Sequence, residues 1–268
     1  MRARTSRSIL ASLSLILCGT DDPGFAGSSD RCIHAKPPDV IFLQDIEPSI
    51  VEDMRYASAN NFVGRPLAGY PPRASCMLTR QAADALKRVQ LVLQQNGLSL
   101  KVYDCYRPDR AVRDIMTWAY DHSGTTTKSQ YYPRLDKKEL GSLGYLSNRS
   151  PHSRGSTVDL TIVPHPSPPQ PARVQLGERK SCIAEDRAPD SSLDFGTGFD
   201  CFDELSHTHN PDVGEEARRN RAYLVKEMAR AGFRNYPREW WHFELVGEPH
   251  GEGCFDFPVK ARQPAAQP

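Results

Sequence analysis

Two short segments of the sequence carry side chains that could bind a metal ion. In the first, His152 and Asp159 lie seven positions apart, at the start of an apolar run that ends at Val163. In the second, Glu239 and His242 lie on either side of two tryptophans. Two imidazoles and one carboxylate suit zinc, and a catalytic zinc has three protein ligands and a fourth position open for water. We therefore predict a zinc site formed by His152, Asp159 and His242.

Glu239 is placed to act as a base beside this metal. Zinc lowers the pKa of a water molecule that it binds, and a nearby carboxylate can accept the proton. Positions three apart on an ideal strand point to opposite faces, so Glu239 and His242 share a site only if the chain bends there. Pro237 favours such an irregular entry to the strand. Taken alone, either segment fits a buried core histidine or a surface carboxylate better than a metal site.

The composition is that of an ordinary globular chain. The 268 residues are 38% hydrophobic and 25% charged, with a formal net charge of +1 at pH 7. A chain of this length can bury one hydrophobic core, so we expect a single domain over 27–261. A balanced charge without a basic run gives no electrostatic reason to expect nucleic acid or an anionic membrane surface as a partner. Any binding partner must therefore be recognised by a local site and not by the overall charge of the protein.

The first residues are typical of a secretory signal. Positive charges precede an apolar run at 9–17 that is too short to cross a bilayer as a stable helix. Small residues just before position 27 fit a cleavage site, so we expect removal of 1–26 and export to the periplasm or the medium. A lipid anchor at Cys18 is a minor alternative, because the preceding Leu17 is bulky where a small residue is usual.

Of the seven cysteines, all except Cys18 remain after removal of the leader. An even number in an exported protein indicates disulfides, although sequence alone cannot choose among the pairings. No two cysteines have CxxC spacing, so we do not expect a structural cysteine–zinc cluster. Two predicted bridges join neighbouring segments and the third joins the two ends of the mature chain: Cys76–Cys105, Cys182–Cys201 and Cys32–Cys254.

Hydrophobic periodicity predicts three helices and several strands. The helices should cover 80–96, 109–120 and 214–231, the first beginning after a Thr79 cap. The strands should cover 50–56, 98–103, 159–163 and 240–246, with 98–103 half-buried because its apolar residues alternate with polar ones. The remaining predictions concern connections: a surface segment at 27–49, a loop at 60–72, a long connection with one short helix at 121–149, an exposed proline-rich insertion at 164–192 and a disordered tail at 262–268.

Five groups of residues form a recognisable set of motifs: 54–56 with 60–65 (Asn-Asn-Phe-Val-Gly-Arg), 104–108 (Asp-Cys-Tyr-Arg-Pro), 150–159, 196–200 (Gly-Thr-Gly-Phe-Asp) with 203–207, and 239–242 (Glu-Trp-Trp-His) with 255–259. In these motifs the sequence resembles the zinc D-alanyl-D-alanine dipeptidases of the VanX type. The similarity runs in family order from about Val51 to Lys260, which is most of the mature chain.

The resemblance implies an α+β fold in which a small, mostly antiparallel sheet carries one zinc ion and helices pack on one side. It implies that His152, Asp159 and His242 are the zinc ligands. Glu239 matches the general base that activates water and later protonates the leaving amine. Arg107 matches the arginine that faces the scissile carbonyl oxygen, where a guanidinium can stabilise the developing negative charge; its alternative is a surface salt bridge.

The resemblance also implies a dipeptide substrate, D-Ala-D-Ala. Asp200 and Tyr56 match the groups that hold the substrate ammonium, and Ser150 matches a residue near its carboxylate. A pocket that binds a charge at each end favours dipeptides over longer chains. Each of these three residues could instead be a turn cap or a core hydroxyl. An exported enzyme would act in the turnover or salvage of wall-derived dipeptide, and the insertion at 164–192 could narrow or widen the substrate mouth.

Three other functions compete with this one. A zinc D,D-carboxypeptidase or endopeptidase would trim peptidoglycan stems with the same metal chemistry in a more open cleft. A non-catalytic module would use the metal only to stabilise a wall-binding surface. A serine hydrolase built from Ser150, His152 and Asp159 is disfavoured, because a serine two residues from its histidine does not readily reach the needed geometry. His207 and His209 could form a second metal pair, but we expect an exposed loop there.

Overall fold

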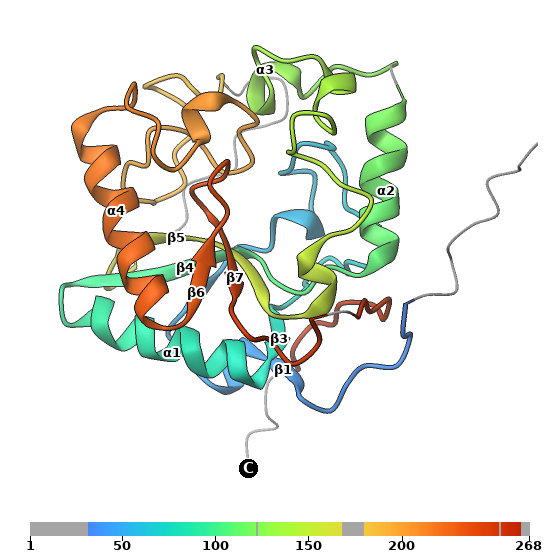
Figure 1. The fold of residues 1–268 in the computed structure, drawn as a ribbon, viewed down its shortest axis with the longest axis vertical. Helices are drawn as coiled ribbons and strands as arrows, with labels where there is room; N and C mark the ends of the chain where they lie inside the picture. The colour runs from blue at the N-terminus through green and yellow to red at the C-terminus, as the bar shows by residue number, and fades with distance from the viewer. Residues whose placement is uncertain (1–31, 122, 168–179, 252, 264–268) are drawn as a thin grey trace, which may run out of the picture. The chain divides into compact units, whose positions relative to one another are not determined.

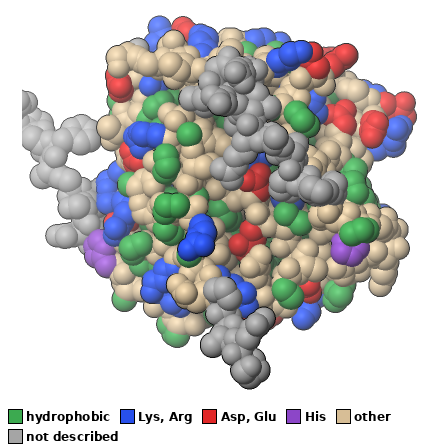
Figure 2. All heavy atoms as spheres, turned by 180° about the vertical axis from the view of Figure 1, so that it is seen from behind, with side chains coloured by type: hydrophobic (Ala, Val, Ile, Leu, Met, Phe, Trp, Pro, Cys, Tyr) green, Lys and Arg blue, Asp and Glu red, His purple; other side chains and the backbone are tan. Residues whose placement is uncertain are grey.

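The computed structural model describes residues 32–121, 123–167, 180–251 and 253–263. The predicted leader at 1–26 with Cys18, residues 168–179 of the predicted insertion, and residues 264–268 of the predicted tail lie outside the described residues. Positively and negatively charged side chains are interspersed over the face shown in Figure 2, in keeping with the net charge of +1.

A five-stranded sheet with the strand order β2-β4-β5-β7-β6 forms the centre of the fold (Figure 1). β2 and β4 are parallel, and the other three pairings are antiparallel. β1 and β3 form a separate antiparallel pair. The strands are β1 (Val40–Phe42), β2 (Val51–Glu52), β3 (Met77–Thr79), β4 (Leu98–Asp104), β5 (Thr157–Pro164), β6 (Phe233–Asn235) and β7 (His242–Leu245). The predicted α+β fold with a mostly antiparallel sheet is confirmed.

The three predicted helices are confirmed, with ends that differ by at most two residues. They are α1 (Arg80–Gln94), α2 (Asp109–Tyr120) and α4 (Glu215–Arg230), and a one-turn helix, α3 (Lys128–Tyr131), lies in the predicted long connection. Short 3-10 helices are η1 (Leu43–Asp45), η2 (Arg55–Ala57), η3 (Lys137–Glu139), η4 (Pro151–Arg154) and η5 (Glu204–Ser206). As predicted, the Thr79 hydroxyl caps α1 by accepting a hydrogen bond from the Ala82 N–H at 3.3 Å.

The helices pack on the sheet through apolar faces. α1 contacts β4 and α4, and α4 contacts β6, whereas α2 lies on the side of the fold opposite α4 (Figure 1). Within the described residues, the helices are all too short or too polar to cross a membrane. Fully buried side chains between these helices and the sheet include Leu86, Leu100, Ile162, Leu224 and Phe243.

Three predictions about the amino-terminal half are wrong. The strand predicted at 50–56 ends at Glu52, because Arg55 turns back to pair with Asp53 (Nε to Oδ2, 2.7 Å) and the chain enters η2. Of the surface segment predicted at 27–49, residues 27–31 lie outside the described residues, and 32–49 contribute β1 to the small sheet and bury Leu43 completely. The strand predicted to be half-buried, β4, is covered on both faces, and even Lys101 is fully buried.

Lys101 is buried because it meets a charge from the insertion. Its ammonium lies 3.6 Å from Asp190 Oδ2, and the Asp190 carboxylate also accepts hydrogen bonds from Tyr103 and Arg55. Of the described residues of the predicted insertion, 164–167 and 180–192, Cys182 is buried and the others are exposed or half-buried. The disulfide to Cys201 and the ion pairs of Asp190 connect this segment to the rest of the fold without an apolar core of its own.

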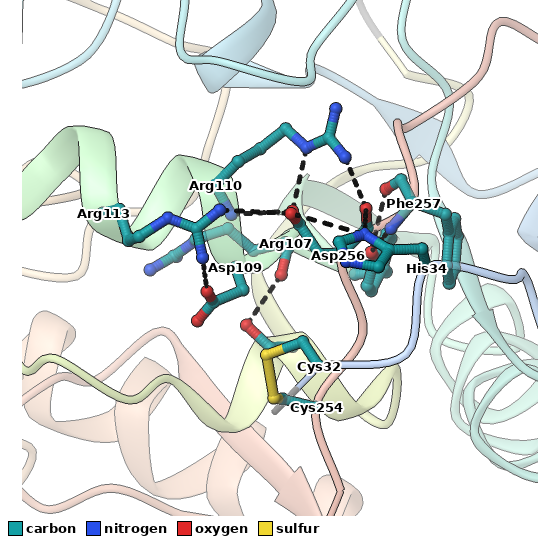
Figure 3. The surroundings of a disulfide bond; sticks show 11 residues. Cys32, His34, Arg107, Asp109, Arg110, Arg113, Cys254, Asp256 and Phe257 are labelled. Atoms are coloured by element: carbon teal, nitrogen blue, oxygen red, sulfur yellow. Dashed lines mark hydrogen bonds and ion pairs between the residues drawn. A yellow bond between two sulfur atoms is a disulfide. The ribbon is translucent and has the colours of Figure 1, made fainter. Parts of the chain in front are cut away.

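The structure contains the three disulfides that we predicted, Cys32–Cys254, Cys76–Cys105 and Cys182–Cys201. Figure 3 shows how the bridge between the two ends of the chain is supported by charge. The Asp256 carboxylate, two residues after Cys254, accepts hydrogen bonds from Arg110 (Nε, 2.8 Å) and Arg113 (3.2 Å) of α2. The carboxyl-terminal segment is thus fixed to α2.

The stability of the folded protein should fall as the pH rises from 4.5 to about 7, the range in which Glu52 titrates. Burial raises the pKa of Glu52 from 4.5 to about 7, and its Oε1 is buried without a hydrogen-bond partner. Between these pH values the folded state keeps a proton that the unfolded state has lost, so the free energy of unfolding decreases by about 3 kcal/mol. Glu52→Gln should remove that decrease, making the variant more stable than wild type at pH 8 and equal to it at pH 4.

Urea unfolding at pH 4, 6 and 8 measures this effect. Glu216→Gln on the exposed face of α4 is the matched control and should behave as wild type. If the free energy of unfolding of Glu52→Gln decreased with pH as steeply as that of wild type, groups other than Glu52 would cause the decrease.

Candidate metal centre and active site

Neighbouring strands and one tight turn bring the three predicted metal ligands together. Asp159 on β5 and His242 at the start of β7 are direct partners in the register of the two strands. His152 lies in η4, immediately before β5. The Ser150 hydroxyl caps η4 by accepting the His152 N–H at 3.3 Å, and Gly155 ends it in the left-handed region with φ 82°. This turn places His152 Nε2 3.3 Å from both Asp159 Oδ1 and His242 Nδ1.

The spacing of the ligand atoms fits a tetrahedral zinc ion. His152 Nε2, Asp159 Oδ1 and His242 Nδ1 lie 3.1 to 3.3 Å from one another. Ligands held about 2.0–2.1 Å from zinc in a tetrahedron are separated by about 3.3–3.4 Å. All three side chains are buried, and they form the single such group found within the described parts of the chain. The donor set and its geometry therefore suit zinc.

Neighbouring groups orient the two imidazoles for this role. His152 Nδ1–H donates to the Cys105 carbonyl at 2.7 Å, which leaves Nε2 as the atom that faces Asp159. Glu244 Oε1 lies 3.7 Å from His242 Nε2 on the opposite side of that ring. Burial alone would raise the pKa of Asp159, but the two imidazoles bring the pKa well below its usual value. The cluster thus favours a positive charge at its centre.

Glu239 lies beside this cluster because the chain turns before β7, as the sequence required. Its N–H donates to the Tyr236 carbonyl at 3.0 Å, and its own carbonyl accepts the His242 N–H at 3.2 Å. Its Oε2 is 3.7 Å from His242 Nδ1. Burial raises the pKa of Glu239 to about 7. A carboxyl group with this pKa can both accept and donate a proton near neutral pH.

Arg107 follows β4 and reaches the metal cluster. Its Nε donates to Asp104 Oδ2 at 2.9 Å, and one terminal nitrogen lies 3.3 Å from Asp159 Oδ2. Its guanidinium also lies over the Tyr56 ring, 4.8 Å from the centroid. Arg107 is therefore part of a buried network rather than a surface salt bridge.

Sequence reasoning missed the role of Asp104, although it lies within the quoted arginine motif. Asp104 is fully buried and accepts hydrogen bonds from both Arg107 and the Tyr70 hydroxyl, the latter at 2.7 Å. In the sequence, the position of Asp104 three residues before Arg107 was the signal that could have indicated this contact. Nothing in the loop sequence around Tyr70 indicated the contact, because it depends on tertiary packing.

Asp200 and Tyr56 meet at the same site from distant parts of the chain. The Tyr56 hydroxyl donates to Asp200 Oδ2 at 3.1 Å, and both side chains are buried. Asp200 has φ 59°, in the left-handed region that few residues with a side chain adopt, and it directly precedes the bridged Cys201. Burial, together with the charge of Asp159, raises the pKa of Asp200 well above its usual value. An arriving ammonium group would stabilise its ionised form.

These groups line one small cavity of about 190 Å³. This is below the roughly 300–1,000 Å³ usual for pockets that hold drug-sized ligands. Part of its wall comes from 144–147 and Arg149, in the long connection to which sequence reasoning gave no role. The cavity is lined by the site residues Tyr56, Arg107, Ser150, His152, Asp159, Asp200, Glu239 and His242, and by apolar side chains that include Phe62, Val112, Ile115, Phe202 and Trp241.

The described part of the insertion lines a different and larger cleft of about 900 Å³, which includes Arg55 and Asp190. The prediction that the insertion shapes the substrate mouth is therefore not supported for residues 180–192. His207 Nε2 lies 3.1 Å from the Tyr145 hydroxyl, and His209 is exposed, as predicted. Ser150 contacts His152 through the backbone N–H, which is a capping contact and not that of a serine nucleophile.

Comparison with known proteins agrees with this geometry. The model of a family described as D-ala-D-ala dipeptidase matches residues 36–167 and 185–260. The gap between the two matched parts falls within the insertion predicted at 164–192.

Curated relatives extend over most of the chain. A D-alanyl-D-alanine dipeptidase of Enterococcus faecium is 35% identical over 82% of this chain and 97% of its own length. Proteins with the same name from Streptomyces coelicolor and Escherichia coli are 34% and 32% identical, over 82% and 77% of this chain and 98% and 84% of their own lengths. The chain is therefore a metallopeptidase of the D-ala-D-ala dipeptidase family.

Proposed function

We propose that this protein hydrolyses the dipeptide D-alanyl-D-alanine with one zinc ion per chain. The observation that carries the proposal is that the metal cluster and the Tyr56–Asp200 pair face the same small cavity. His152, Asp159 and His242 would hold the metal, which would lower the pKa of a water molecule and polarise the scissile carbonyl. The names of the curated relatives support the choice of substrate.

The chain's own residues supply binding at both ends of the dipeptide. Asp200, with Tyr56 donating to it, would receive the ammonium group, and an ion pair there would offset the burial of the Asp200 charge. Ser150 accepts the His152 N–H, and its own hydroxyl hydrogen can be donated to the substrate carboxylate. Apolar residues such as Phe62 and Trp241 leave room for small side chains. A cavity this small favours a dipeptide over a longer peptide.

Proton transfer and charge stabilisation fall to two residues in this proposal. Glu239 takes a proton from the attacking water and later delivers it to the leaving amine, for which its pKa of about 7 is suited. Arg107, held by Asp104, directs its guanidinium at the carbonyl oxygen as negative charge develops there. Because Arg107 is already fixed before the substrate binds, little reorganisation accompanies the reaction.

We further propose that the protein is exported and acts in the turnover or salvage of wall-derived dipeptide. Three disulfides support this location, because such bridges persist in oxidising compartments. The charged and apolar pattern of 1–26 supports it as well.

A substrate comparison tests the proposed activity. The purified protein should contain about one zinc per chain and should cleave D-Ala-D-Ala, measured by release of free D-alanine. N-acetyl-D-Ala-D-Ala should resist cleavage, because Asp200 would lose its cationic partner. Rapid cleavage of the acetylated dipeptide or of a pentapeptide stem would instead assign the protein as a D,D-carboxypeptidase. Zinc binding without hydrolysis of any of these compounds would support a non-catalytic module.

A further inference from the structure

Residues 104–107, which are the last residue of β4 and the three that follow it, support the metal centre through their backbone as well as their side chains. The Cys105 carbonyl accepts His152 Nδ1–H at 2.7 Å, and the Arg107 N–H donates to the His152 carbonyl at 3.2 Å. Asp104 holds the Arg107 side chain. The position of segment 104–107 therefore determines the orientation of a metal ligand and of the arginine that faces the substrate.

A covalent link fixes this segment. Cys105 is bonded to Cys76, and both residues are fully buried. Cys76 directly precedes β3, and the Tyr106 N–H donates to the carbonyl of Met77 in that strand at 3.0 Å. Segment 104–107 is thus attached to β3 by one disulfide and one hydrogen bond. β3 belongs to the small two-stranded sheet, outside the five-stranded sheet that carries Asp159 and His242.

We propose that the Cys76–Cys105 disulfide is a positioning element of the metal centre, which keeps the Cys105 carbonyl on His152 and thereby governs how firmly the metal is held. The proposal rests on the function proposed above, since it assumes that His152 binds zinc. A backbone carbonyl cannot be replaced by a side-chain substitution, so its placement depends on what anchors the chain. Without the disulfide, the Cys105 carbonyl would no longer fix the tautomer and ring orientation of His152 that leave Nε2 free for the metal.

The Cys32–Cys254 bridge is a control that separates positioning from general stabilisation. Its cysteines are 222 residues apart, compared with 29 for Cys76 and Cys105. In the chain-entropy description a disulfide that closes a longer loop stabilises more, so loss of Cys32–Cys254 should lower the Tm more. The Cys32–Cys254 bridge is connected to the metal centre only through a neighbouring residue: the Phe255 N–H donates to the Ser153 carbonyl at 2.8 Å. If the bridges act only through general stabilisation, the variant with the larger loss of Tm should also release zinc faster. If Cys76–Cys105 positions the metal ligand, the variant with the smaller loss of Tm should release zinc faster.

The experiment compares Cys76→Ala/Cys105→Ala with Cys32→Ala/Cys254→Ala in the zinc-loaded protein. Zinc release to a chromogenic chelator, the visible spectrum of the cobalt-substituted protein, and the Tm are measured on each. The first variant should release zinc at least about tenfold faster than wild type and change the cobalt spectrum, because loss of a group that orients a metal ligand costs about 10–100-fold in affinity. The second should have the lower Tm and release zinc at the wild-type rate. Zinc release rates that follow the order of the Tm values would overturn the proposal.

A second measurement covers the case in which the first variant does not fold. The wild-type protein is treated with dithiothreitol, which gives two electrons and two protons to each bridge and yields two thiols. Samples are alkylated over time and mapped by mass spectrometry. Zinc loss should coincide with opening of Cys76–Cys105, and retention of zinc after that bridge has opened would contradict the proposal. Because zinc release is the readout, a wild-type protein that holds zinc but spares D-Ala-D-Ala would refute the proposed function alone.

Discussion

Glu239→Gln should lower kcat for D-Ala-D-Ala by about a thousandfold while the zinc content stays at the wild-type level. Loss of a general base typically costs about 10²–10⁴ in rate. The replacement has the same shape but cannot accept a proton near neutral pH. Glu239 Oε2 lies 3.7 Å from His242 Nδ1 without belonging to the ligand group, so metal binding should survive. Steady-state kinetics and metal analysis of the same preparation measure both quantities.

The Glu216→Gln variant serves again as the control, because Glu216 is exposed on α4. It should retain wild-type kcat and KM. If Glu239→Gln kept more than about a tenth of the wild-type kcat, the proton would have to be transferred by another group. If it lost zinc, Glu239 would act in metal binding instead.

Arg107→Lys should lower kcat by about a hundredfold or more with a smaller effect on KM. Removing one donor to a developing oxyanion costs about 10²–10³ in kcat. Lysine keeps the positive charge that buried Asp104 and Asp159 require, so the variant should fold. It lacks the planar fork that lets one guanidinium contact Asp104, Asp159 and the substrate together. Kinetics with D-Ala-D-Ala, together with the Tm, separate the chemical effect from a folding defect.

Arg110→Lys is the matched control, since Arg110 pairs with Asp256 on a more exposed side of α2. It should leave kcat unchanged. A decrease of less than about fivefold in Arg107→Lys would mean that the guanidinium only balances the charge of Asp104. It would then contribute little to catalysis.

The main helices could be predicted because their signals are local. α1, α2 and α4 each repeat apolar residues at helical spacing, and caps such as Thr79 act within one turn. The half-buried prediction for β4 failed because the alternation of apolar and polar residues implies one solvated face. In the fold, that face is covered by Asp190 from a segment that no local pattern could place there.

The sequence allowed us to predict that the candidate metal ligands lie together, but not which residues support them. The motifs around His152, Asp159, Glu239 and His242 are each contained in a few consecutive positions, and their match to one family indicated that they meet. Asp104, Tyr70 and the cavity wall at 144–149 gave no comparable signal, because their part in the site depends on the groups that surround them in the fold.

The sequence alone was enough to predict the main helices, the candidate metal ligands, an even number of cysteines available for disulfides, and the family, since each depends on the identity and spacing of residues along the chain. The three-dimensional fold was needed to show that Asp104 secures Arg107, that the Cys105 carbonyl orients His152, and that residues 180–192 of the insertion line another cleft. These contacts join residues through backbone atoms, buried charge and packing between distant strands. Their energies depend on three-dimensional proximity, which residue order does not specify.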